Sequence, residues 1–190
     1  MRHFILLFFL LFFVGNSMLY AQNKKDSNGL KQGKWVYLGA DRILSGYGAT
    51  TKIEEGNYTN GRKTGEWIKY HFDGKTIKLK GNYVNNRPEG NYTRYYSNGV
   101  IREKGSFNNN EYKGELVRYH KNGQEAYRAQ FNDKGEEMGL VKHYYKNGQV
   151  EMEYTKIDGK LSDKITTYFK NGNVKSVQLV QAGKLGKKTK

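Results

Sequence analysis

The chain has 190 residues, enough for one domain, and a formal net charge of +15 at pH 7. It contains no cysteine, which excludes disulfide bonds, lipid attachment at cysteine, thiolate metal ligands and cysteine nucleophiles. One proline and 36% hydrophobic residues argue against a disordered polymer. Because the apolar residues are rich in aromatics, including 16 tyrosines, a thin extended sheet is expected rather than a thick two-layer core.

The first 21 residues have the layout of a signal peptide. Arg2 precedes an apolar run from Phe4 to Val14, and Ala21 stands just before Gln22. The run is 11 residues long, well short of the roughly 20 needed to cross a bilayer. Cleavage after Ala21 is therefore favoured over a membrane anchor. We expect export to the periplasm or the extracellular space.

Asn-Gly and Asp-Gly pairs divide the remaining chain at nearly constant intervals. Such pairs adopt the positive φ angles of a type I′ turn and mark β-hairpins. Five pairs succeed one another in steps of 24 or 25 residues: Asp73-Gly74, Asn98-Gly99, Asn122-Gly123, Asn147-Gly148 and Asn171-Gly172. A second series of turns lies between them, at Gly29, Gly61, Asn86, Asn110, Gly135, Gly159 and Gly183.

This spacing predicts an all-β fold. Tandem β-hairpin repeats of about 24–25 residues each, over residues 22–181, are expected to form a single elongated, twisted antiparallel sheet. The first unit carries an insertion near residues 39–52, either a loop on the working face or a tolerated surface excursion. Residues 182–190 have the composition of a frayed basic tail.

Residue types recur in columns within the units. Four residues after each second-series turn stands a glycine, where a strand opening or a bulge is expected, until Asp163 breaks the column. Two residues further on comes a large side chain for a buried stripe: Trp35, Trp67, Tyr92, Leu116, Val141 and Ile165. Three residues beyond lies a tyrosine column: Tyr70, Tyr95, Tyr119, Tyr144 and Tyr168. These two columns are predicted to lie on opposite faces of the sheet.

The tyrosine column has two interpretations. Tyrosine is a favoured anchor at protein interfaces, but a column at this spacing is also expected if the rings stack along the sheet and hold the hairpins together. The stacking role is preferred.

A candidate binding face combines cations with aromatic or histidine side chains. The position before each tyrosine is basic at Lys69, Arg94 and Arg118. The position after it holds His71, Tyr96, His120 and Tyr145. Both positions are predicted to share the face of the large column, which would form a ladder of cations flanked by rings. Such a ladder suits an anionic phospholipid or an envelope polysaccharide.

Catalysis and metal binding are not expected. The predicted mature chain has three histidines, at His71, His120 and His143, and all fall at regular positions in the repeat grid. His71 and His120 lie two repeats apart, too far to share a metal whose ligands must each lie about 2 Å from it. The sequence also lacks Gly-x-Ser-x-Gly, His-Glu-x-x-His and Walker segments. We therefore expect no enzyme, no cofactor and no metal.

The repeated pattern resembles the bacterial variant of the MORN repeat. The clearest copies are Gly61 to Gly74, Gly-Arg-Lys-Thr-Gly-Glu-Trp-Ile-Lys-Tyr-His-Phe-Asp-Gly, and the stretch Gly114 to Gly123. The resemblance implies tandem hairpins in one elongated, twisted sheet. It also implies protein scaffolding or phospholipid contact, and many bacterial members carry an antitoxin-like label. For an exported chain, that label would imply binding of an exported protein.

The leading hypothesis is thus an exported repeat protein that acts as a protein–protein interaction or scaffold module. The alternative is binding of anionic lipid or glycan through the basic-aromatic face. Nucleic acid is disfavoured because an exported chain meets lipid head groups, glycans and acidic proteins first. Self-association through the terminal edge strands is a further alternative.

Overall fold

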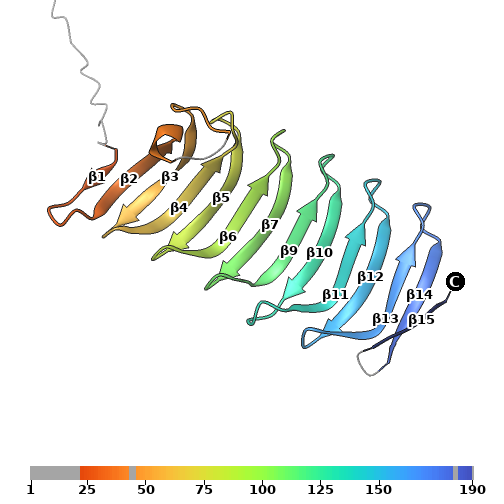
Figure 1. The fold of residues 1–190 in the computed structure, drawn as a ribbon. Helices are drawn as coiled ribbons and strands as arrows, with labels where there is room; N and C mark the ends of the chain where they lie inside the picture. Colours follow the sequence, from red (N-terminus) through yellow and green to blue (C-terminus); the bar gives the residue numbers. More distant parts are fainter. Residues whose placement is uncertain (1–21, 43–45, 182–183, 190) are drawn as a thin grey trace, which may run out of the picture.

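The computed structural model describes residues 22–42, 46–181 and 184–189, so the predicted signal peptide lies outside the described residues. These residues form one open sheet of 15 strands (Figure 1). The first half contains β1 (Lys24–Lys25), β2 (Lys31–Leu38), the 3-10 helix η1 (Gly39–Asp41), β3 (Lys52–Thr59), β4 (Arg62–Tyr70), β5 (Ile77–Val84), β6 (Arg87–Tyr95), β7 (Ile101–Asn108) and β8 (Glu111–Tyr112). The second half contains β9 (Gly114–Tyr119), β10 (Glu125–Phe131), β11 (Glu137–Tyr144), β12 (Val150–Ile157), β13 (Lys160–Tyr168), β14 (Val174–Gln181) and β15 (Lys184–Thr189).

The strands pair in chain order, each antiparallel to its neighbours, and only the short β8 lies off this path. Figure 1 shows the result as a single elongated layer whose hairpin turns follow one another along its two long edges. The predicted all-β array of tandem hairpins is confirmed. No helix in the described part of the chain has the length and apolar character to cross a bilayer.

Residues with positive φ make the turns and bulges possible. In the five Asp-Gly and Asn-Gly pairs only the glycine has a positive φ, so these pairs do not form the type I′ turns that the sequence predicts. The turn at Asn85-Asn86 needs left-handed backbone at both residues, with φ of 51° and 71°, a conformation that asparagine tolerates better than most residues. Asp163, which breaks the glycine column of the sequence, still has a φ of 65° and matches Gly65 at 63°. The pairing register shifts beside each of these two residues, as expected for a β-bulge.

The large and tyrosine columns lie on opposite faces of the sheet, as predicted. On the face that we call the Trp face, the Trp67 ring packs edge-on against the rings of Tyr58 and Tyr83. On the other face, the Tyr face, the Tyr70 hydroxyl donates to Glu55. Successive side chains of a strand therefore alternate between ring packing on the Trp face and polar contacts on the Tyr face.

Small residues alternate with the large column across the Trp face. Trp67 lies between Gly56 on β3 and Gly81 on β5, and Tyr92 lies between Gly81 and Gly105. A Cβ atom added to Gly56 would lie 2.3 Å from the Trp67 ring. The missing side chains make room for the rings of the next strand, which is how a single layer buries Trp67 completely.

Two buried clusters result from this alternation. The first contains Trp35, Tyr37, Ile53, Tyr58 and Trp67, and the second contains Tyr92, Leu116, Tyr127, Ala129 and Val141. Both lie before residue 142, so the core occupies the first two-thirds of the array.

The insertion and the C-terminal segment form more structure than the sequence predicts. Within the insertion, Arg42 pairs with Glu54, and the Tyr47 hydroxyl donates to the carbonyl of Tyr70 at 2.7 Å. The insertion therefore packs onto the first repeat. The C-terminal segment was expected to be a frayed basic tail, but Lys184–Thr189 forms β15 and pairs with β14. The backbone continues the sheet because β14 leaves an unpaired edge next to it.

Candidate binding surfaces

The predicted cation ladder lies in one continuous row across the Trp face. The pairing register joins its members strand by strand in the order Tyr37, Glu54, Lys69, Leu79, Arg94, Glu103, Arg118, Tyr127, His143, Met152, Thr167 and Ser176. The basic side chains come from the first strand of each hairpin, and the residues between them come from the second. Two of these intervening residues are buried glutamates.

Those glutamates form ion pairs with the cations of the ladder. Glu103 is 5% exposed and accepts hydrogen bonds from Arg94 and Arg118, each at 2.7 Å, and from the Tyr92 hydroxyl. Glu54 is 1% exposed and pairs with Arg42 and Lys63, while Lys69 lies 4.0 Å away. Arg94 and Arg118 thus serve as partners of a buried acid. They are not free cations for an anionic surface.

The electrostatics of Glu103 show that the carboxylate is held in its charged form. Burial raises its pKa, but hydrogen bonds from Tyr92 and Arg118, with the nearby charge of Arg94, outweigh burial and lower the pKa below its ordinary value. Glu137 repeats the arrangement further along the face, where the hydroxyl of Tyr127 and the ammonium of Lys156 lower its pKa against burial. The row is therefore an internal ionic network.

His143 continues the row in a different environment. Its ring lies between Tyr127 and Tyr154, with centroid distances of 5.1 and 6.0 Å. Burial lowers the pKa of His143 more than the neighbouring glutamates raise it. The neutral imidazole thus acts here as a packed ring.

The residues after the tyrosine column connect successive repeats. Each side chain bonds to the backbone carbonyl of a column tyrosine in the next repeat, about 24 residues later. The five bonds, which we call rungs, run from Tyr47 to Tyr70, His71 to Tyr95, Tyr96 to Tyr119, His120 to Tyr144 and Tyr145 to Tyr168, at 2.7 to 3.1 Å. The candidate binding residues His71, Tyr96, His120 and Tyr145 therefore satisfy strand-end carbonyls.

The tyrosine column does not form a ring stack. Among the aromatic pairs of the described residues, none joins two of Tyr70, Tyr95, Tyr119, Tyr144 and Tyr168. The physical reason is that members lie two strands apart, about 10 Å, with a second strand between them. The hydroxyls of Tyr70 and Tyr168 bond to acids instead, Tyr70 to Glu55 and Tyr168 to Glu153 at 2.6 Å. The rungs, and not tyrosine stacking, join the repeats at this edge.

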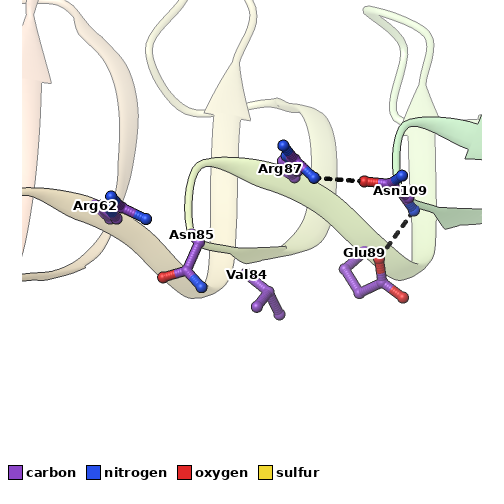
Figure 2. Close-up of a pocket in the computed structure, with 6 residues that line it drawn as sticks. All are labelled: Arg62, Val84, Asn85, Arg87, Glu89 and Asn109. Carbon is purple, nitrogen blue, oxygen red and sulfur yellow. Dashed lines mark hydrogen bonds between the residues drawn. The ribbon is translucent and has the colours of Figure 1, made fainter.

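A shallow cavity lies on the opposite edge of the sheet, at the second series of turns (Figure 2). It has a volume of about 430 Å³ and is lined by Arg62, Val84, Asn85, Arg87, Glu89 and Asn109. Arg87 donates to the Asn109 side chain at 2.7 Å, and the Asn109 backbone N–H donates to Glu89 at 3.1 Å. Its polar groups therefore largely satisfy one another, and no aromatic ring offers a platform for a ligand.

The exposed apolar side chains gather at the other end of the array. Seven of the ten large hydrophobic residues that are exposed in the described chain lie after residue 137: Met138, Leu140, Ile157, Phe169, Val174, Leu179 and Leu185. Leu140 shares the Tyr face with Tyr144 on β11, and Leu179 reaches the same face through its pairing with Lys164. This apolar region has no counterpart in the prediction of the binding face.

The two end strands are poorly suited to pairing with another copy. The Asn23 side chain bonds to both the N–H and the C=O of Val36 and so occupies part of the β2 edge. The strand at the other end, β15, carries Lys184, Lys187 and Lys188. Lysine-rich and blocked edges disfavour edge-to-edge association.

Sequence reasoning missed the buried acids and the small column, although signals for both were present. Gly56, Gly81, Gly105 and Ala129 recur in steps of 25, 24 and 24 residues. Glu54 and Glu103 each stand two residues before a member of that column. No group of three or more potential metal ligands occurs in the described ranges.

Comparison with known families agrees with this architecture. The family model described as the MORN repeat variant matches residues 88–109 and 139–155. The first segment contains most of β6 and all of β7, and the second contains most of β11 and of β12, so each corresponds to a repeat of the sheet. Two repeats of the sheet thus match the MORN variant, a class of repeat that typically serves as a binding or scaffold module and is generally not enzymatic. No curated protein matches the chain.

Proposed function

We propose that the chain is an exported, non-catalytic repeat module that binds another protein through the C-terminal third of its sheet. The observation that carries this proposal is the unequal distribution of exposed apolar side chains, seven of which lie after residue 137. Such a concentration of exposed large apolar side chains in one part of a sheet is uncommon on a protein that acts alone and favours an interaction site there.

The packing of the first two-thirds supports the same assignment. The large aromatic residues of its two buried clusters are covered by neighbouring side chains, and its cations on the Trp face already have buried acidic partners. An anionic lipid or glycan at this face would have to compete with Glu103 for Arg94 and Arg118. A protein partner at the C-terminal third would displace no internal ion pair of this row.

Site-specific photo-crosslinking tests the proposed surface. A photoreactive residue replaces Leu179, which is 51% exposed, in the full-length chain, expressed in the cells that produce it. The matched control replaces Val84, which is 53% exposed in the first two-thirds of the sheet. We expect a discrete protein adduct from the Leu179 position and none from the Val84 position. Equal adducts at both positions, or an adduct only at Val84, would contradict the proposal.

Export is a separate part of the proposal, and the signal-like segment of residues 1–21 supports it. N-terminal sequencing of the protein recovered from the envelope or the medium should give a chain that starts at Gln22. A cytosolic protein that retains Met1 to Ala21 would refute export without bearing on the binding surface. The antitoxin-like role, in which the partner would be an exported protein, depends on both results.

A further inference from the structure

The two long edges of the sheet differ in charge. The five Asp-Gly and Asn-Gly turns of one edge, residues 71–76, 96–100, 120–124, 145–149 and 169–173, carry four lysines and one aspartate. The five connections that follow the second strands, residues 60–61, 85–86, 109–110, 132–136 and 158–159, carry one lysine and three acids. We call the first the basic edge. Figure 1 shows its turns following one another along the length of the sheet.

Three lysines recur at the same position of the basic edge. Lys121, Lys146 and Lys170 each precede the asparagine of an Asn-Gly turn, and all three are exposed. None of them belongs to an ion pair found among the described residues, in contrast to Arg94 and Arg118 on the Trp face. They are therefore free to meet an external anion.

A ladder of asparagine side chains holds these lysines in register. The Asn98 amide donates to the carbonyl of Lys121, Asn122 donates to that of Lys146, and Asn147 donates to that of Lys170. The distances are 3.4, 2.7 and 3.0 Å. Each asparagine also accepts the backbone N–H two residues later in its own turn. The backbone that carries each lysine is thus tied to the preceding repeat.

The spacing of the three cations follows from the sheet. Each repeat contributes two strands of about 4.8 Å, so neighbouring lysine positions lie about 10 Å apart and the outer two about 19 Å apart. Further cations stand at the second residue of the strands that follow these turns. Lys78, Arg102 and Lys175 occupy this position, and one acid, Glu151, occupies it as well. The result is an edge of net positive charge whose regular lysines lie in the last three of its five turns.

We propose that Lys121, Lys146 and Lys170 form a track for one extended anionic polymer whose repeating units carry phosphate or carboxylate groups. A single file of cations at a constant interval matches a linear polyanion, which can contact all three at once and gain from multivalency. A flat membrane would gain less, because the turns at Lys121 and Lys146 expose no large hydrophobic residue to insert, and the turn at Lys170 exposes a single one, Phe169. The track extends the proposed function, since it would hold the module on an envelope polymer while its apolar surface remains available.

The test uses linear inorganic polyphosphate of graded length as the probe and the full mature chain as the protein. The variant carries Lys121→Gln, Lys146→Gln and Lys170→Gln. The control removes the same charge from exposed sites without ion-pair partners on the opposite edge, by Arg62→Gln, Lys134→Gln and Lys160→Gln. A third variant with arginine at the three track positions keeps the charge. Circular dichroism should give the same melting temperature for all of them.

The expected results are specific to the track. Polyphosphate long enough to span about 19 Å should bind the track variant at least about tenfold more weakly than wild type or the control. The slope of log affinity against log salt should fall by about 2, since three contacts are lost at about 0.7 each in single-strand polyelectrolytes. The arginine variant should bind like wild type. Chains shorter than the span should bind weakly to every variant.

Three outcomes would overturn the proposal. One is an equal loss of binding in the control, which would indicate non-specific attraction to net charge. Another is affinity that does not depend on polymer length. The last is vesicles of anionic phospholipid that bind more tightly than the polymer and lose binding in the same track variant, which would assign the edge to a membrane. Crosslinking at Leu179 is read separately, so failure of either proposal leaves the other standing.

Discussion

The first two-thirds of the sheet and its C-terminal third share one topology but differ in packing. In the first part, glycine or alanine alternates with a large side chain across the Trp face, and both buried clusters form there. In the last third, Tyr154 and Gln178 occupy the positions of the small column, opposite Ile165. The apolar residues of this third are half-buried, as Ile165 is, or exposed, as Leu179 and Leu185 are.

This difference shows that the strand order and the burial of side chains depend on different residues. Turn residues with positive φ and the bulges beside them recur in both parts, so hairpin order does not depend on a filled face. Burial depends on the small column, because a glycine or alanine leaves room for the large side chain of the neighbouring strand. The same repeat architecture therefore yields one region that buries its large side chains and another region whose apolar side chains remain accessible to solvent.

Truncation of the large column should give the greatest contrast between the two parts. Trp67 is fully buried, so Trp67→Ala should lower the free energy of unfolding by about 3–5 kcal/mol. Ile165 holds the same column position but is only half-buried, and Ile165→Ala should cost clearly less. Urea denaturation of both variants measures the difference. Equal losses would contradict the division of the sheet.

The buried Glu103 should make the free energy of unfolding depend on pH through the first part of the sheet only. Glu103→Gln should destabilise the fold by about 1.5–3 kcal/mol at pH 7, because charged hydrogen bonds to Arg94 and Arg118 are weakened. The folded-state pKa of Glu103 lies below its usual 4.5, so the wild-type advantage is fully present above pH 4.5 and disappears as pH falls through the folded value.

The matched variant lies at the equivalent position of the C-terminal third. Ser176 is 3% exposed and shares a neutral hydrogen bond with Thr167 at 2.6 Å. Ser176→Ala should cost about 0.5–1.5 kcal/mol, and this cost should be the same at pH 7 and pH 3. Denaturation at the two pH values distinguishes the variants, and a wild-type advantage over Glu103→Gln that persists at pH 3 would argue against the ionised carboxylate.

The small column can be tested by adding one methyl group. Gly56→Ala places a Cβ against the Trp67 ring and should destabilise the fold by about 1–3 kcal/mol. Gln178→Ala, at the same column position in the last third, should change stability by less than about 0.5 kcal/mol. Thermal melts of the two variants provide the comparison. A Gly56→Ala variant as stable as wild type would show that the Trp67 ring moves aside without cost.

Loss of a rung should have the smallest effect on stability, and this effect should be similar in both parts of the sheet. Tyr96→Phe and Tyr145→Phe each remove one hydroxyl from a bond to a carbonyl in the next repeat. Each change should cost about 1 kcal/mol. Tyr119→Phe is the control, because its hydroxyl makes no rung. Amide exchange of the acceptor repeat reports the loss locally, and a stability change no larger than that of Tyr119→Phe would remove the rungs from the account.

The sequence predicted the architecture better than the roles of individual side chains. Turn pairs and the period of two place Trp67 and Tyr70 on opposite faces without further information. The pairing of Glu103 with Arg94 and Arg118 depends on strand register, which the bulges shift. The rungs were also missed, because the residue after the strand end, such as His120, turns toward the next repeat instead of continuing the alternation.

Amide hydrogen exchange on the free protein tests the central claim most directly. The account divides one sheet into a packed part, β2 to β11, and an open part, β12 to β15, that is available to a partner. It predicts strong protection in β4, β6 and β9 and markedly weaker protection in β13 and β14, where few buried apolar side chains support the backbone. Uniform protection along all repeats would contradict it.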